Sequence, residues 1–157
     1  MYTIYRAGPV QAVQTTLIYE VADMIMDAFK FSGLGEIYTA SPEKARQYVR
    51  TMMINPDCLL SVAVDNETND VAGVLLANSY PALLGNGIAA HEQLIWVAPQ
   101  YRNGRILTMF LKEFEEWSEE LKADIMFMVS HEEHTRFEKI YARHGYKPSD
   151  RVYVKGN

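Results

Sequence analysis

A turn rich in polar side chains follows an apolar stretch of the chain and leads directly into an amphipathic segment. It contains Arg102, Asn103, Gly104 and Arg105. If a helix begins at this turn, its first backbone N–H groups have no helical acceptor, and together with the helix dipole they attract an anion. The two arginines add positive charge, so a phosphate or pyrophosphate fits here. A plain strand-to-helix turn with two solvated arginines accounts for the same residues equally well.

A second polar cluster, His131-Glu132-Glu133-His134, has residue types that bind metals. It lacks the His-Glu-x-x-His spacing, and no motif supplies a third ligand. The single cysteine, Cys58, leaves no Cys-based zinc site and no intrachain disulfide. We therefore predict no metal, and we interpret the cluster as a capped, hydrated helix start.

Composition narrows the classes of function. The chain has 157 residues, with 15 Lys and Arg against 20 Asp and Glu, which gives a net charge of −5. An acidic chain is a poor candidate for nucleic-acid binding, and there is no run of about 18 apolar residues that would span a membrane. The N-terminus has no apolar core of a signal peptide, so we expect a cytoplasmic protein. The length predicts one domain over residues 1–157.

The polar turn must be positioned by the elements around it. Hydrophobic periodicity and capping residues predict helices and strands that alternate along the chain. The expected strands are 3–6, 59–64, 71–77, 89–97, 125–129 and 151–155, and the expected helices are 15–30, 42–54, 105–121 and 132–143. This order predicts a mixed α/β fold, a mostly antiparallel sheet with helices on its faces.

Two details of this prediction concern the strands beside the turn. The strand 89–97, the helix 105–121 and the strand 125–129 form a right-handed β-α-β unit, so the two strands are expected to be parallel. The segment 125–129 is uniformly apolar, which is typical of a strand buried on both faces.

Three segments resemble the GNAT-type N-acetyltransferase superfamily. Residues 97–104, Val-x-Pro-x-Tyr-Arg-Asn-Gly, resemble its acetyl-CoA pyrophosphate loop, and 137–146 resemble its last helix with the text Leu-Tyr-x-x-x-Gly-Phe. Residues 71–74 resemble the strand before the cofactor strand. The order of elements is also the family's. The resemblance is good from about residue 58 to 155 and rests on element order alone before that, and it implies a GNAT-like acyltransferase fold.

The loop departs from the family pattern Gln/Arg-x-x-Gly-x-Gly/Ala. When the chain is aligned with this pattern on Arg102 and Ile106 without gaps, Arg105 and Leu107 stand at the two glycine positions, and Gly104 is displaced by one residue. Glycine permits positive φ and a close approach of the backbone to phosphates. The larger side chains could crowd the pyrophosphate, whereas a one-residue shift of the loop would give Gly104 the expected role.

The resemblance implies acetyl-CoA as cofactor. Backbone groups of the strand would bond the pantetheine arm, and backbone N–H groups of the loop would hold the pyrophosphate. The implied cofactor-binding residues are Ile95, Val97, Arg102, Asn103, Gly104, Arg105, Ile106, Leu107, Thr108, His134 and Arg143. A solvated helix end explains Arg143 as well as a phosphate contact does.

The resemblance also implies a general acid and a base. Tyr141 stands where the family commonly has the acid that protonates the leaving thiolate, and a phenol keeps its proton at neutral pH; a core tyrosine is the alternative. Glu92 and His91 are both candidates for the base. Strict alternation places His91 with Ile95 and Val97 and Glu92 on the opposite face, but a bulge in this strand would reverse that arrangement.

The predicted function is transfer of acetyl from acetyl-CoA to a primary amine by direct attack in a ternary complex. The cofactor would lie where the strands 89–97 and 125–129 separate, and the acceptor would contact Phe31, Tyr38 and Tyr80. A small amine, a peptide N-terminus and a protein lysine remain open as acceptors, and a homodimer is plausible. The alternative is an inactive GNAT-fold binding or structural module, since short chains with a degenerate loop resemble those of tailed bacteriophages.

Overall fold

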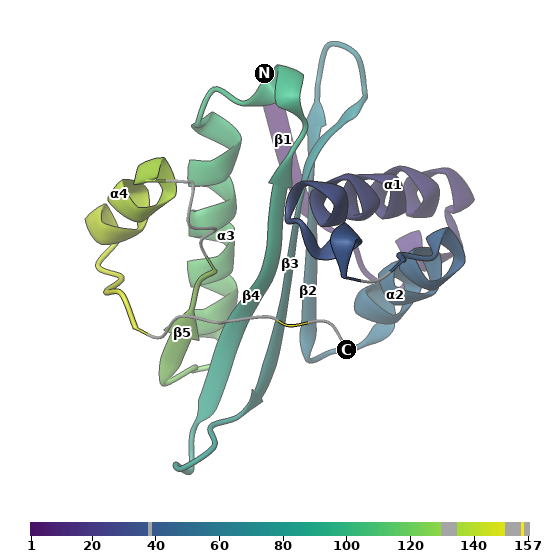
Figure 1. Ribbon diagram of the computed structural model, residues 1–157. Coiled ribbons are helices and arrows are strands. Elements are labelled where there is room, and N and C mark those ends of the chain that lie inside the picture. Colours follow the sequence, from purple (N-terminus) through teal and green to yellow (C-terminus); the bar gives the residue numbers. More distant parts are fainter. Residues whose placement is uncertain (38, 130–134, 150–154, 156–157) are drawn as a thin grey trace.

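The computed structural model describes residues 1–37, 39–129, 135–149 and 155 (Figure 1). The helices and strands over these residues follow the predicted order. The strands are β1 (Tyr2–Arg6), β2 (Cys58–Asp65), β3 (Val71–Pro81), β4 (Ile88–Val97) and β5 (Ile125–Phe127), and the helices are α1 (Thr15–Phe31), α2 (Pro42–Ile54), α3 (Arg105–Glu120) and α4 (Thr135–Arg143).

The strands form one mixed sheet in the order β1-β2-β3-β4-β5. Neighbouring strands from β1 to β4 are antiparallel, whereas β5 is parallel to β4, as the β-α-β unit predicts. Helices α1 and α2 cover one face of the sheet, and α3 and α4 lie on the other (Figure 1). The prediction of a mostly antiparallel α/β sheet with helices on both faces is confirmed.

Helix α3 is held against the sheet by its apolar stripe. Phe110 and Phe114 are fully buried there, and Gly73 of β3 permits the close approach, because a Cβ at this glycine would lie 3.1 Å from the Phe110 ring and 2.9 Å from the Trp96 carbonyl oxygen. The acidic face of α3 is tied to the sheet edge by Arg6, which forms ion pairs with two of its glutamates. The start of α3, which carries the polar turn, therefore has a fixed position.

Helix α2 begins as its sequence predicts. The Ser41 hydroxyl oxygen accepts a hydrogen bond from the Lys44 N–H at 3.3 Å, and Pro42 occupies the first turn, where its missing N–H costs nothing. Its buried side chains Val49, Met52 and Met53 pack with those of α1 on the second face of the sheet.

The prediction for the segment 125–129 is wrong in two respects. β5 ends at Phe127, and Ile125 and Met126 are 44% and 39% exposed rather than buried. In the described part of the sheet β5 is the edge strand, joined to β4 through three residue pairs. The predicted strand 151–155 and the first turn of the predicted helix 132–143 fall largely outside the described residues.

Replacing Phe110 by Ala is expected to lower the free energy of unfolding by about 3–5 kcal/mol, because it removes a fully buried ring between α3 and the sheet. Urea denaturation measures this change. Leu84→Ala is the control, since Leu84 is 98% exposed and its truncation should have little effect. Equal effects of the two substitutions would contradict the packing described here.

Candidate active site

The site is organised by a bulge in β4. Leu94 pairs with Leu76 of β3 and Glu92 pairs with the next residue, Ala77, so Gln93 is an extra residue on β4. Because one residue is inserted, side chains beyond the bulge reverse their faces. Glu92 therefore shares the α3 face with Ile95 and Val97, and the alternative in which a bulge reverses strict alternation is the one observed.

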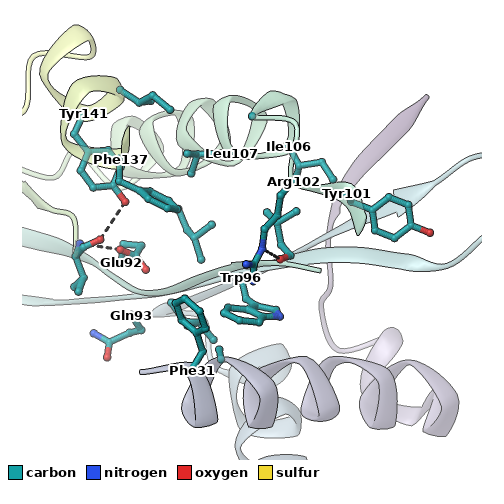
Figure 2. Close-up of a pocket in the computed structure, with 17 residues that line it drawn as sticks. Phe31, Glu92, Gln93, Trp96, Tyr101, Arg102, Ile106, Leu107, Phe137 and Tyr141 are labelled. Atoms are coloured by element: carbon teal, nitrogen blue, oxygen red, sulfur yellow. Dashed lines mark hydrogen bonds between the residues drawn. The ribbon is translucent and has the colours of Figure 1, made fainter. Parts of the chain in front are cut away.

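The edge of β4 opens at this bulge. β4 pairs with β5 at Ala89, Ala90 and His91, and from Glu92 to Val97 that edge has no β5 partner. A cavity of about 240 Å³ extends along this open edge (Figure 2). Its walls come from the end of α1, from β4, from the turn before α3, from α3 itself, from Val129 and from α4.

A carboxyl group and a phenol meet at one end of the cavity through a single residue. Glu92 Oε2 accepts the Val129 N–H at 2.8 Å, and the Tyr141 hydroxyl donates to the Val129 carbonyl oxygen at 3.1 Å (Figure 2). Glu92 is 2% exposed and Tyr141 is 7% exposed. Two ionisable groups from β4 and α4 are thus held side by side in apolar surroundings.

Burial changes the titration of both groups. Desolvation raises the pKa of Glu92 to about 8, and the hydrogen bond from Val129, which favours the charged carboxylate, only partly opposes this effect. Burial also raises the pKa of Tyr141 well above its usual value, and the nearby Glu92 and Tyr146 raise it further. Tyr141 therefore keeps its proton at neutral pH, whereas Glu92 exchanges its proton within the physiological range.

The polar turn forms the other end of the cavity. Gly104 has φ of 87° and immediately precedes α3, so the glycine displaced by one residue supplies the left-handed backbone. Asn103 Oδ1 accepts the Arg105 N–H at 3.0 Å, and the helical ladder starts with the Thr108 N–H, which bonds to the Gly104 carbonyl oxygen. The N–H groups of Ile106 and Leu107 precede that ladder, so they are suited to an anion.

The two side chains at the family's glycine positions differ in environment. Leu107 is 7% exposed and packs with Leu111 and Tyr141, so it lines the cavity between α3 and α4. Arg105 is exposed at the start of α3. The apolar wall of the cavity and the solvent-exposed cation therefore come from the first turn of the same helix.

Arg102 reaches from the turn across the open edge of β4. Its Nε donates to the Val97 carbonyl oxygen at 2.8 Å, which is one of the backbone groups expected to bond a cofactor arm. Its guanidinium carbon lies 4.5 Å from the centre of the Trp96 ring and 5.6 Å from that of Phe31. The side chain thus contacts both the strand edge and the end of α1.

Several predicted site residues lie outside the cavity lining. His91 faces Tyr80, whose hydroxyl is 3.4 Å from Nδ1, and its ring contacts that of Phe127 at a tilt, so neither His91 nor Tyr80 joins Glu92 and Tyr141. Burial lowers the pKa of His91. Thr108 bonds the Gly104 carbonyl oxygen, and Arg143 is exposed at the end of α4.

Of the acceptor residues predicted from sequence, Phe31 lines the cavity, but Tyr38 lies outside the described residues, as does the predicted cofactor residue His134. Asn103 acts as a cap for α3 and donates from Nδ2 to the Tyr2 hydroxyl at 3.3 Å. The cavity lining includes four of the residues predicted from the sequence to bind the cofactor, Ile95, Val97, Gly104 and Ile106.

The site residues that were not predicted from the sequence include Trp96 and Val129. Trp96 could have been found from strict alternation, because it stands between Ile95 and Val97 and so lies on the opposite, α1 face of β4. Val129 contributes only its backbone N–H and carbonyl groups. No residue type signals such a role, so sequence reasoning had no means of finding it.

No group of three or more His, Cys, Asp or Glu residues suited to a metal ion occurs among the described residues. Over the same part of the chain, none of the helices has the length and apolar character needed to cross a membrane.

The sequence profile of the acetyltransferase (GNAT) family matches residues 18–146. The chain belongs to this family. Among solved structures, a probable acetyltransferase aligns over 99% of this chain and 97% of its own, with 15% identity and a TM-score of 0.75. Membership of the GNAT family and the GNAT-like fold are thereby confirmed, and they support acetyl transfer as the general class of activity.

Two further GNAT structures have stated acceptors. An aminoglycoside 6′-N-acetyltransferase from Acinetobacter baumannii aligns over 100% of this chain and 99% of its own, with 16% identity and a TM-score of 0.69. A ribosomal-protein-alanine N-acetyltransferase from Brucella melitensis biovar Abortus aligns over 99% and 98%, with 12% identity and a TM-score of 0.68. At these identities the similarity establishes the fold alone. A search of curated proteins gives no match.

Because the pKa of Glu92 is raised by burial, the folded state holds its proton more tightly than the unfolded state. The stabilisation of the folded state that comes from protonated Glu92 is complete below pH 4.5, which is the pKa of this group in the unfolded chain. It is lost as the pH rises to about 8, the pKa in the folded state. We expect the free energy of unfolding of the wild type to fall by a few kcal/mol more than that of Glu92→Gln over this interval. Urea titrations at several pH values measure the difference.

The matched control is Glu116→Gln, which removes a half-exposed carboxylate from α3. This variant should retain the pH dependence of the wild type. If Glu92→Gln also retains it, Glu92 is not a buried group with a raised pKa.

Proposed function

We propose that this GNAT protein transfers acetyl from acetyl-CoA to a primary amine by direct attack in a ternary complex. One observation carries the proposal: Glu92 and Tyr141 meet through Val129 at the wall of a cavity that runs along an open strand edge to the start of α3. A base, an acid and an anion-attracting helix terminus therefore share one cavity.

The cavity suits the parts of acetyl-CoA. The N–H groups of Ile106 and Leu107, with the positive charges of Arg102 and Arg105, fit a diphosphate at the start of α3. The open edge of β4 around Ile95 offers backbone donors and acceptors to an extended amide arm, which would bind as an added strand does. When bound, acetyl-CoA supplies the thioester that the amine attacks. Thr108 and Arg143 remain predicted contacts at the margin of this site.

Glu92 is the proposed general base. The ionised carboxylate accepts a proton from the ammonium group of the acceptor, directly or through one water molecule, and this frees the nitrogen lone pair of the amine for the attack. A pKa of about 8 makes Glu92 a stronger base than an ordinary glutamate, while a useful fraction is still ionised near neutral pH. His91, the other predicted base, faces away from this cavity toward Tyr80 and Phe127.

Tyr141 is the proposed general acid. Its O–H donates to the Val129 carbonyl oxygen, and rotation about the C–O bond would direct the proton into the cavity toward the leaving sulfur. Its raised pKa keeps the phenol protonated until that step. The acceptor nitrogen loses two protons in all, one to Glu92 before the attack and one as the amide forms, whereas the sulfur gains one from Tyr141. Passage of one proton from Glu92 to Tyr141 restores both groups, and the other proton is released to solvent.

The acceptor would approach from the α1 side of β4, where Phe31 lies. Tyr38 and Tyr80 remain predicted acceptor contacts. A small amine, a peptide N-terminus and a lysine side chain all carry the required amino group. A single domain over residues 1–157, a homodimer and a cytoplasmic location also remain predictions.

The contact of Arg102 with Val97 favours a second candidate function. An arginine that covers the edge of β4 could keep the cavity closed to a cofactor, as expected of a GNAT-fold module that binds a partner without transferring acetyl. Binding of acetyl-CoA distinguishes the two functions.

Calorimetric titration with acetyl-CoA is expected to give micromolar affinity for the wild type. Gly104→Trp should lose this binding, because a bulky side chain would stand at the start of α3 and the residue would have to keep a φ of 87°. Gly104→Asn is the matched control, since asparagine tolerates positive φ. A folded wild type that shows no binding up to millimolar acetyl-CoA would contradict the enzymatic function and leave the binding module.

Tyr141→Phe is expected to lower kcat by about 10²-fold or more and to leave the affinity for acetyl-CoA nearly unchanged, because only the transferable proton is removed.

In the wild type, kcat/KM should rise with pH to a plateau above about 8, since the base must be ionised. Glu92→Gln should lose that inflection. An unchanged profile in Glu92→Gln would assign the base to another group.

A further inference from the structure

A pair of aromatic rings in tilted contact lines the α1 side of the cavity. The ring centres of Phe31 and Trp96 are 5.5 Å apart at an interplanar angle of 60°. Figure 2 shows both rings between the sheet and α1, whereas Leu107 and Tyr141 lie on the opposite side of β4. The cavity therefore reaches around the open strand edge, with apolar walls on both faces of the sheet.

A cation already occupies this pair. The guanidinium carbon of Arg102 is 4.5 Å from the centre of the Trp96 ring and 5.6 Å from that of Phe31. Both distances fall within the range of about 6 Å at which an aromatic face attracts a cation. Among the described residues, the guanidinium makes one hydrogen bond to the backbone, from Nε to the Val97 carbonyl oxygen.

We propose that Phe31 and Trp96 form a subsite for a cationic group of the acceptor, which the guanidinium of Arg102 fills in this structure. The inference rests on the proposed function for its acceptor, and it adds the chemical class of that acceptor. Trp96 lies four positions beyond Glu92 on β4, but the bulge takes up one of them, so the strand advances by three residue rises, on the order of 10 Å. The acceptor is therefore a flexible primary amine with a second cationic group about that far from the amine that is acetylated.

Arg102 links this subsite to the phosphate end of the cavity. Its backbone lies two residues before Gly104, so its guanidinium lies within reach of an anion at the start of α3. A diphosphate bound there competes for the guanidinium and draws it off the aromatic pair. Cofactor binding thus vacates the subsite, and the cationic acceptor binds second.

Fluorescence of Trp96 tests this arrangement without any acetyl transfer. The chain has two tryptophans, and Trp117→Phe leaves Trp96 as the only reporter. The probe is 1,8-diaminooctane, and 1,8-octanediol is its neutral control. In this background Arg102→Met should bind the diamine at least tenfold more tightly than the parent, and saturating coenzyme A should tighten binding to the parent similarly. Lys112→Met, which removes an exposed cation from α3, should behave as the parent.

Phe31→Leu, added to Arg102→Met, should weaken diamine binding about fivefold, because one aromatic face is lost. Equal binding of the diamine and the diol, or no difference between the parent and Arg102→Met, would overturn the subsite. If coenzyme A fails to bind while Arg102→Met still gains affinity for the diamine, the subsite stands and the proposed acetyl transfer fails. If coenzyme A binds and the diamine response is absent, the subsite alone fails.

Discussion

The single residue inserted into β4 is the constraint on which the site depends. Gln93 has no opposite residue on β3 in the strand register, so every side chain after it changes face relative to a regular strand. As a result Glu92 projects toward α3 and α4 with Ile95 and Val97, while Trp96 projects toward α1. A regular strand in this position would bury Glu92 on the other side of the sheet and leave Tyr141 without a carboxyl group beside it.

The bulge acts together with the short pairing between β4 and β5. Three residue pairs hold these strands together, and their separation after His91 exposes the backbone of β4 along the cavity. The phosphate end is set independently by Gly104 and Asn103, which shape the start of α3. Arg102 connects the two ends, because it starts in the turn and contacts Val97 on the strand. Each part of the site thus rests on a separate local feature of the chain.

Most of the fold could be predicted from the sequence, because amphipathic periodicity and caps such as Ser41 specify elements locally. The burial of the segment 125–129 could not, since it depends on which strand lies beside it. At the site, the resemblance indicated Tyr141 and the turn, but it left Glu92 and His91 as alternatives. The position of the bulge places Glu92, and not His91, in the cavity beside Tyr141, and that position depends on the pairing with β3 rather than on any residue type.

The central claim is that Glu92 is a buried carboxyl poised to exchange a proton beside Tyr141. NMR titration of protein labelled at the glutamate side-chain carboxyl carbons, with Glu92→Gln to assign the resonance, measures this property directly. We expect a midpoint near 8 for Glu92, well separated from the ordinary midpoints of exposed glutamates. A midpoint near 4.5 would show that Glu92 is solvated, and it would contradict the geometry from which the acid–base pair and the proposed activity are derived.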